Sequence, residues 1–296
     1  MEPNQSYGKR LWYLWGPIVI KFGISYLVYV IVLAALMVVY TSVQSGGDPD
    51  AMMSILESNA QTQQMYDTLM EQLVNISVPV EGIAALITIP IMLILFHKDR
   101  VKAKQIESLL HKAPLWKYIG VIAIAGTMSL ALNNLILIGN LSELSASYEE
   151  TMKNMYEPSL PMQIICLGIL IPVCEELVYR GLMYKRLRIQ LKFSHAALYS
   201  SIVFAITHGN IVQMLYGFAM GMLLAYVYEK YGSVKAPIAG HVTANLLSIL
   251  GTYFHLYEWL IADPMRMGVV TVACAAIASS VYVWMQRMEP QENPSL

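Results

Sequence analysis

Residues 173–187 read VCEELVYRGLMYKRL, a stretch that places two adjacent glutamates and an arginine inside a segment that is otherwise apolar up to its basic end. An unpaired charge in the middle of such a segment is strongly unfavourable if the segment lies in a membrane. Glu175, Glu176 and Arg180 must therefore be paired with one another or be in contact with water. The rest of the chain decides between these alternatives.

The composition indicates a membrane protein. Of the 296 residues, 56% are hydrophobic and only 13% are charged, and the mean hydropathy is +0.51. These values exceed what one soluble core usually needs. The formal net charge of −1 provides no basic face that could neutralise phosphates, so we expect no nucleic-acid partner.

The cysteines give no sign of a disulfide framework or a zinc ribbon. Cys166, Cys174 and Cys274 all lie in apolar segments, and none of them has CxxC spacing. We expect all three to be packing residues.

Eight apolar segments are close to the roughly 20 residues that cross a bilayer. They lie at 17–42, 77–97, 117–139, 160–184, 195–208, 211–229, 236–256 and 266–286. Lys and Arg gather in alternate linkers, whereas the intervening linkers are acidic or nearly neutral. Because basic residues collect on the cytoplasmic side, the pattern predicts an all-α polytopic transmembrane helical bundle with about eight spans and both termini in the cytoplasm.

Residues 50–75 are too polar to span the membrane. They carry a partial apolar stripe, and Asp50 can cap a helix at their start. We expect an extracytoplasmic amphipathic helix on the outer surface of the bundle.

Three later segments carry polar residues one helical turn apart: CEELVYR at 174–180, FAITH at 204–208 and HVTAN at 241–245. In an α-helix, Glu176 and Arg180 are about 40° apart on one face, whereas Glu175 is about 140° away from Arg180. We therefore expect Glu176 and Arg180 to pair as supporting residues, and Glu175 to point elsewhere, where it is available for chemistry.

Peptide hydrolysis would use this set of side chains. The reaction needs a base for water and hydrogen-bond donors for the oxyanion that forms on the carbonyl oxygen. Glu175 suits the base, and His208 could share its proton or hold the water. His241 and Asn245, on one helix face, could donate to the oxyanion.

A metal site is the alternative use of the same residues. Glu175, His208 and His241 could bind a divalent metal such as zinc with one open position for water. The HExxH helix of zinc proteases is absent, and the nearby Arg180 argues against a dication. We favour hydrolysis without a metal or another cofactor.

In these residues the sequence resembles the CAAX protease and bacteriocin-processing (CPBP, or Abi) family of intramembrane endopeptidases. The family's ordered motifs EExxxR, FxxxH and HxxxN stand here as Glu175–Arg180, Phe204–His208 and His241–Asn245. The resemblance covers about residues 160–255, and the segment between the last two motifs is more similar to bacterial members than to the eukaryotic prenyl-protein proteases.

The resemblance implies an integral membrane protein of the bacterial plasma membrane that cleaves a peptide or protein substrate reached from the lipid bilayer. It implies catalytic roles for Glu175, His208, His241 and Asn245, supporting roles for Glu176 and Arg180, and a cavity open to the cytoplasm. The substrate would be a CAAX-type, leader or bacteriocin-type peptide.

The resulting domain organisation has three parts. Residues 1–159 form N-terminal transmembrane helices with the amphipathic segment near 50–75, residues 160–256 form the protease core, and residues 257–296 form the final transmembrane helix and a cytoplasmic tail.

Two alternative functions remain: a non-proteolytic bacteriocin-immunity or membrane scaffold protein of the same fold, and a small transporter that uses Glu175 as a proton carrier. The lack of evident repeated halves disfavours the transporter.

Overall fold

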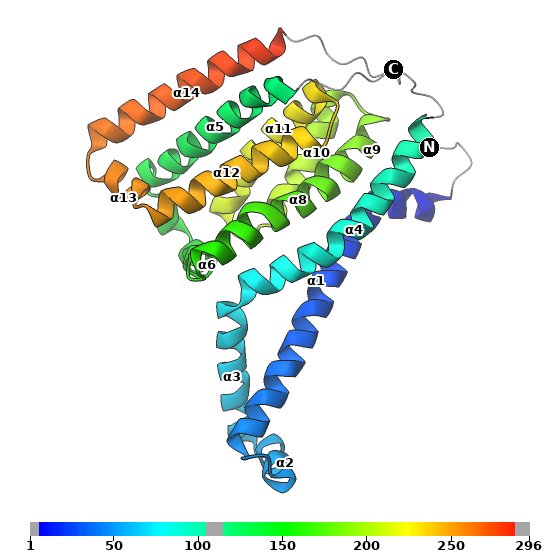
Figure 1. The fold of residues 1–296 in the computed structure, drawn as a ribbon, viewed down its shortest axis with the longest axis vertical. Coiled ribbons are helices and arrows are strands. Elements are labelled where there is room, and N and C mark those ends of the chain that lie inside the picture. Colours follow the sequence, from blue (N-terminus) through cyan, green and yellow to red (C-terminus); the bar gives the residue numbers. More distant parts are fainter. Residues whose placement is uncertain (1–5, 105–114, 288–296) are drawn as a thin grey trace.

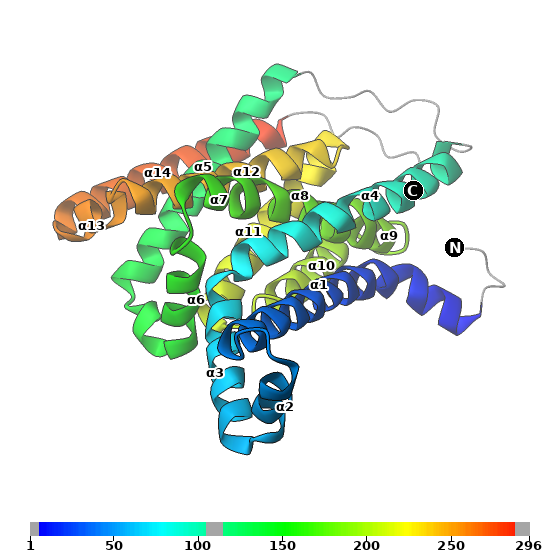
Figure 2. The same cartoon turned by 60° about the horizontal axis from the view of Figure 1, so that its bottom comes forward.

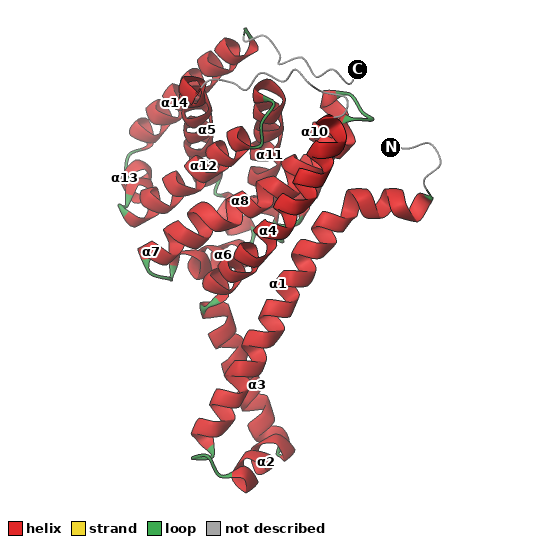
Figure 3. Cartoon of the chain, turned by 45° about the vertical axis from the view of Figure 1, so that its right-hand side comes forward, coloured by secondary structure: helices red, strands yellow, loops and turns green. Residues whose placement is uncertain are grey.

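The computed structural model describes residues 6–104 and 115–287, and every regular element in these two ranges is a helix (Figure 3). The first half contains α1 (Tyr7–Gln44), α2 (Pro49–Glu57), α3 (Asn59–Asn75), α4 (Ser77–Lys104), α5 (Tyr118–Ile138) and α6 (Ala146–Tyr156). The second half contains a continuous helical run from Leu160 to Arg188, α10 (Phe193–Ile206), α11 (Ile211–Tyr231), α12 (Lys235–Tyr253), α13 (Leu256–Ile261) and α14 (Pro264–Gln286). The predicted all-α fold is confirmed.

Each of the eight predicted spans coincides with one helix or with the run Leu160–Arg188. Six of these elements in the described part of the chain are long and apolar enough to cross a membrane: α1, α4, α5, the run Leu160–Arg188, α11 and α14. The other two predicted spans correspond to α10, which has only 14 residues, and α12, which has 19. The number of spans and the cytoplasmic location of the termini stay predictions.

The helices form a bundle with a projecting arm (Figure 1). In the bundle, α5 packs between α12 and α14, and α10 packs against α11. On the other side, α1 runs along α4, and the far end of α1 projects from the bundle together with α2 and α3 (Figures 1 and 2). The polar candidates lie in the bundle, away from this arm.

The predicted amphipathic helix over residues 50–75 is two helices, so that expectation was wrong in its detail. Asp48, not Asp50, caps α2: its side chain accepts a hydrogen bond from the backbone N–H of Asp50, and Pro49 occupies the first helical position. Ser58 has an extended backbone and caps α3, which breaks the segment in two. The apolar stripe nevertheless exists, because Ile55 and two residues of α3, Met65 and Leu69, are buried.

The run Leu160–Arg188 changes its winding around the two glutamates. It consists of α7 (Leu160–Met162), a π-helix (Gln163–Leu170), α8 (Ile171–Glu176), a second π-helix (Leu177–Tyr184) and α9 (Lys185–Arg188). Pro172 at the start of α8 has no N–H to donate to a carbonyl of the preceding turn. The wider π turns before it change which N–H each carbonyl bonds, so the missing N–H need not leave a carbonyl unpaired. The glutamates therefore lie at a local departure from regular α-helix, a feature that is frequent at functional sites.

The turn between α10 and α11 lies within the bundle because α10 is short. At about 1.5 Å per residue, the 14 residues of α10 extend only about 21 Å, less than the hydrocarbon core. Gly209 allows the turn with a φ of +80°, and the Asn210 side chain accepts from the N–H of Gln213 to cap α11. Non-helical backbone at such a depth is tolerated where it is buried in protein or lines a water-filled cavity.

Candidate active site

Glu176 and Arg180 form the predicted ion pair. Arg180 Nη1 donates to Glu176 Oε1 at 2.7 Å, and both side chains are completely buried. The Arg180 guanidinium also lies over the ring of Phe204, with 4.4 Å from its carbon to the ring centroid. Two interactions therefore hold Arg180 in the low-dielectric interior, and the predicted supporting role of this pair agrees with its burial.

His241 connects α12 to the same carboxylate. Its Nδ1 atom lies 2.8 Å from Glu176 Oε1, and because a carboxylate oxygen accepts, Nδ1 carries the proton. Its other ring nitrogen, Nε2, lies 3.9 Å from Glu175 Oε2, which is too long for a direct hydrogen bond and suits a bridging water. His241 thus lies between the two adjacent glutamates.

Glu175 points away from Arg180, as its angular position on the helix predicts. Its side chain is 13% exposed, whereas that of Glu176 is fully buried, and Glu175 lines a cavity in the bundle. The two glutamates therefore have different surroundings: Glu176 is enclosed by partners, and Glu175 is accessible from the cavity.

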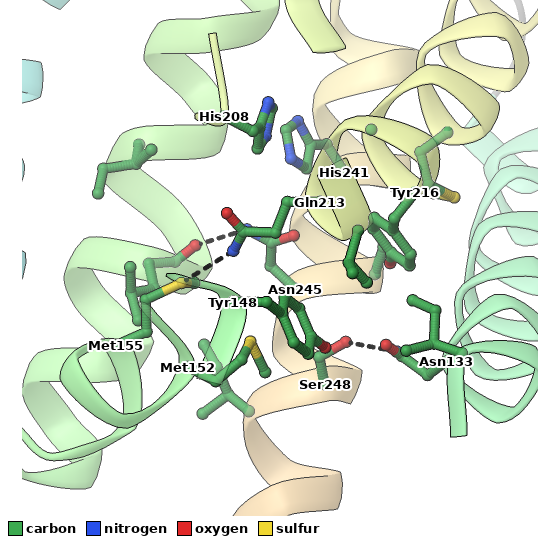
Figure 4. Close-up of a pocket in the computed structure, with 18 of the residues that line it drawn as sticks. Asn133, Tyr148, Met152, Met155, His208, Gln213, Tyr216, His241, Asn245 and Ser248 are labelled. Atoms are coloured by element: carbon green, nitrogen blue, oxygen red, sulfur yellow. Dashed lines mark hydrogen bonds between the residues drawn. The ribbon is translucent and has the colours of Figure 1, made fainter. Parts of the chain in front are cut away.

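His208 lies in the turn after α10 and lines the same cavity. Its Nδ1 atom donates to the backbone carbonyl of Phe204 at 2.9 Å, so Nε2 is left as an acceptor. The Phe204 ring contacts both histidines edge-on, with centroid distances of 4.7 Å to His208 and 5.8 Å to His241. Figure 4 shows the two imidazoles next to each other at one end of the cavity. The short α10 explains how His208 reaches the depth of Glu175.

Asn245 lies one turn after His241 on α12 and also lines the cavity. Its Nδ2 atom donates to the backbone carbonyl of Leu167 at 2.8 Å. A side-chain amide has two N–H groups, so one remains for another acceptor. The structure thus brings Glu175, His208, His241 and Asn245 around one cavity, although their catalytic roles stay predictions.

The cavity has a volume of about 240 Å³ and is mostly apolar. Besides the four predicted residues, α5, α6, α11 and α12 contribute its walls, among them Asn133, Tyr148, Met152, Met155, Gln213, Tyr216, Met220 and Ser248. Figure 4 shows Tyr148, Met152 and Met155 of α6 at the edge of this space. A large apolar cavity with a few convergent polar groups is the usual form of a site for a small molecule or a peptide side chain.

The three residues considered as metal ligands do not make a metal site as they are arranged here. Within residues 6–104 and 115–287, no group of three or more His, Cys, Asp or Glu side chains could hold a metal ion. His208 and His241 both donate through Nδ1 to protein acceptors, which leaves Nε2 of each ring for another partner. We derive no step through a metal.

The sequence analysis missed a second buried ion pair close to the site. Lys21 of α1 is only 7% exposed and lies 3.4 Å from Glu81 of α4, and Ser25 donates to the same carboxylate at 3.2 Å. The ammonium of Lys21 is also close enough to Glu175 to interact with it electrostatically. An ionisable residue inside an apolar span is itself a signal of such a partner, and Lys21 in WGPIVIKFG provides it.

The three cysteines have the predicted role. Cys166, Cys174 and Cys274 are all within the described residues, and each is a buried thiol without a disulfide. Cys166 packs closely against α4, because a Cβ on Gly82 would come within 2.4 Å of the Cys166 sulfur.

Residues 157–247 match the family model described as type II CAAX prenyl endopeptidase Rce1-like. Over 92 residues, the chain is 29% identical to a Bacillus subtilis (strain 168) protein named "Putative membrane peptidase YdiL". That alignment covers 31% of this chain and 38% of the relative, so the chain spans less than half the length of the curated relative it matches. No solved structure matches the chain. Residues 157–247, which hold all three polar motifs, are therefore similar to the Rce1-like CAAX prenyl endopeptidases.

Proposed function

We propose that the chain is an intramembrane endopeptidase that hydrolyses a peptide bond with water activated by Glu175 and His208. One observation supports this function most strongly: the two adjacent glutamates have different surroundings. Glu176 is buried and bonded to Arg180 and His241, whereas Glu175 lines a cavity that two histidines and the Asn245 amide also line. A scaffold would not need an accessible carboxylate in this position.

In the proposed reaction, a water molecule from the cavity donates one hydrogen bond to Glu175 Oε2, the carboxylate oxygen that lies 3.9 Å from His241 Nε2. Glu175 accepts a proton from this water as its oxygen attacks the carbonyl carbon of the substrate. His208 Nε2, which is left as an acceptor because Nδ1 donates to Phe204, accepts a hydrogen bond from the second O–H of the same water.

The negative charge that develops on the carbonyl oxygen then needs donors. The second N–H of Asn245 can donate, and His241 can donate through Nε2 when that atom also carries a proton. The C–N bond breaks as the proton held by Glu175 passes to the leaving amine, so the carboxylate is restored. Glu176 and Arg180 do not touch the reacting atoms and instead hold His241 in place.

The substrate class follows from the family of residues 157–247 and is part of the proposal. A CAAX-type peptide, a leader peptide or a bacteriocin-type precursor would each present a peptide bond to a site within the bundle. An alternative mechanism is hydrolysis that depends on a zinc ion. An alternative function without catalysis is bacteriocin immunity or a membrane scaffold.

The test compares new peptide termini, by mass spectrometry, in membranes of cells that express wild type, Glu175→Gln or Glu149→Gln. Glu149 is an exposed glutamate of α6 and serves as the matched control. We expect cleavage products with wild type and Glu149→Gln and none with Glu175→Gln. If all three proteins are equally expressed and the termini do not differ, the immunity or scaffold function is favoured instead.

A further inference from the structure

We infer that the substrate enters this site from the extracytoplasmic side of the membrane, as an extended apolar peptide segment. The inference rests on the proposed proteolysis for the nature of the substrate. The side on which the cavity opens can be measured without catalysis, so the two can fail separately.

The run Leu160–Arg188 shows the relation that carries the argument. Its cavity-lining residues, Leu167, Ile171 and Glu175, lie in its first part. Apart from Arg180, which is buried and paired with Glu176, its basic residues lie within 185–188. Glu175, the lining residue nearest the basic end, is ten residues, or about 15 Å, from Lys185. The cavity and the basic cluster therefore lie toward opposite ends of this element.

The other helices repeat this relation. The lining residues of α11 lie within 212–220, whereas Lys230 is near its other end, and α12 begins at Lys235 and lines the cavity only from His241 onward. In the same way, Lys117 precedes α5 and Lys192 precedes α10, and both helices line the cavity near their last turns. All five elements place the cavity away from their basic ends. Because Lys and Arg collect in the cytoplasm, the cavity lies toward the extracytoplasmic side.

The bundle is closed on the cytoplasmic side of the site. Tyr179, Arg180, Tyr184 and Leu224 lie in the parts of their helices between the cavity and the basic ends, and all four are completely buried. Phe204, which is 1% exposed, forms the floor of the cavity beneath the two histidines, and the Arg180 guanidinium packs against its ring. A peptide could not pass this layer without unpacking the core.

The opposite side is covered by α6, whose last residues pack against the buried cluster that contains Leu167 and Ile249. Tyr148, Met152, Met155 and Tyr156 of this helix line the cavity, yet none of the residues of α6 is fully buried. One polar contact joins α6 to α11, from Gln213 Nε2 to the sulfur of Met155 at 3.4 Å (Figure 4). The acidic linker that contains α6 is extracytoplasmic by the same charge rule, so this helix is the roof through which a substrate would enter.

The lining of the cavity indicates the chemistry of the substrate. Met152, Met155 and Met220 contribute flexible, polarizable side chains, which adapt to apolar groups of different shape. At the end remote from the histidines, Asn133 Nδ2 donates to Ser248 Oγ at 3.1 Å, which leaves polar atoms that a peptide backbone can bond (Figure 4). An apolar peptide segment at the extracytoplasmic surface fits this combination. The cytoplasmic opening implied by the family resemblance does not.

Cysteine accessibility tests the inference. Ser248→Cys and Met152→Cys place single thiols in the cavity and in its roof. Ser54→Cys in α2 and Ser194→Cys at the basic end of α10 are exposed references for the two sides of the membrane. The native cysteines are buried, and the wild-type chain gives the background. Intact cells are treated with a membrane-impermeant maleimide before and after permeabilisation. The same variants carrying Glu175→Gln show whether labelling is independent of catalysis.

We expect Ser54→Cys, Met152→Cys and Ser248→Cys to react in intact cells, and Ser194→Cys to react only after permeabilisation. Three results would overturn the inference: cavity thiols that react only together with Ser194→Cys, exchanged behaviour of the two references, or cavity thiols that never react although both references do. If the expected labelling is observed but no cleavage is found in the terminal-peptide comparison, the opening stands and the proteolytic function fails.

Discussion

Glu176 and His241, 65 residues apart in the sequence, are joined by a hydrogen bond of 2.8 Å between two buried side chains. The same oxygen of Glu176 accepts from Arg180 at 2.7 Å. The supporting glutamate therefore fixes the histidine as well as the arginine. This contact leaves Nε2 of His241 as the ring atom that can act beside Glu175.

We expect Glu176→Gln to lower both the melting temperature and the cleavage rate, because it leaves the charge of Arg180 buried without a counter-charge. The glutamine oxygen can still accept from both partners, but it lacks the charge that matches Arg180, and the ring of His241 is held less firmly. Thermal unfolding in detergent and peptide cleavage are measured on the same preparation. An unchanged cleavage rate would show that Glu176 does not position His241.

Arg180→Ala should destabilise the protein by about 3 to 5 kcal/mol, because it leaves the carboxylate of Glu176 buried and unpaired. The double variant Arg180→Leu with Glu176→Leu removes both charges and should recover much of the melting temperature without recovering cleavage. Melting curves of the single and double variants test this. A double variant that melts no higher than Arg180→Ala would show that packing of the arginine against Phe204, not its charge, is what stabilises the site.

Two glycines of α11 provide a matched pair of substitutions. A Cβ on Gly221 would come within 3.0 Å of Ser201 and 3.1 Å of the Arg180 guanidinium, whereas a Cβ on Gly217 would make only ordinary contacts of 3.5 Å with His208. We expect Gly221→Ala to lower the melting temperature and cleavage. Gly217→Ala should be neutral or slightly stabilising, because alanine favours the helix by about 1 kcal/mol. Equal effects of the two changes would contradict the close packing at Gly221.

A zinc chelator should leave cleavage unchanged if the reaction needs no metal. We expect this outcome because no group of three or more His, Cys, Asp or Glu side chains in residues 6–104 and 115–287 is arranged to hold a metal ion. Cleavage by the purified protein is measured before and after chelation, and again after zinc is added back. Loss and zinc-dependent recovery would assign Glu175, His208 and His241 to a metal site after rearrangement.

The sequence predicts which side chains of a single helix pair with each other and which point in different directions. The four-residue spacing of Glu176 and Arg180 determines that they pair, and it also determines that Glu175 points elsewhere, so both could be derived from helical periodicity. Local composition likewise predicts the all-α fold and the six long apolar helices among the residues that the structure describes.

The relations between distant helices could not be derived from periodicity. Nothing in the sequence near His241 indicates that its ring would bond to Glu176, since that contact depends on how α12 packs against the run Leu160–Arg188. The sequence does contain a signal for the roof helix α6. Tyr148, Met152, Met155 and Tyr156 follow the spacing i, i+4, i+7, i+8 of an amphipathic helix, but the charge of this linker alone does not predict that helix.

The most direct test of the central claim uses a peptide identified from the membrane comparison and purified protein reconstituted in lipid. The cleavage rate is measured for wild type, Glu175→Gln and the exposed control Glu149→Gln. Removal of a general base typically costs a factor of about 10² to 10⁴, so Glu175→Gln should lose at least about 100-fold while melting like wild type, and Glu149→Gln should cleave at the wild-type rate. A Glu175→Gln protein that cleaves within a few-fold of wild type would contradict the account.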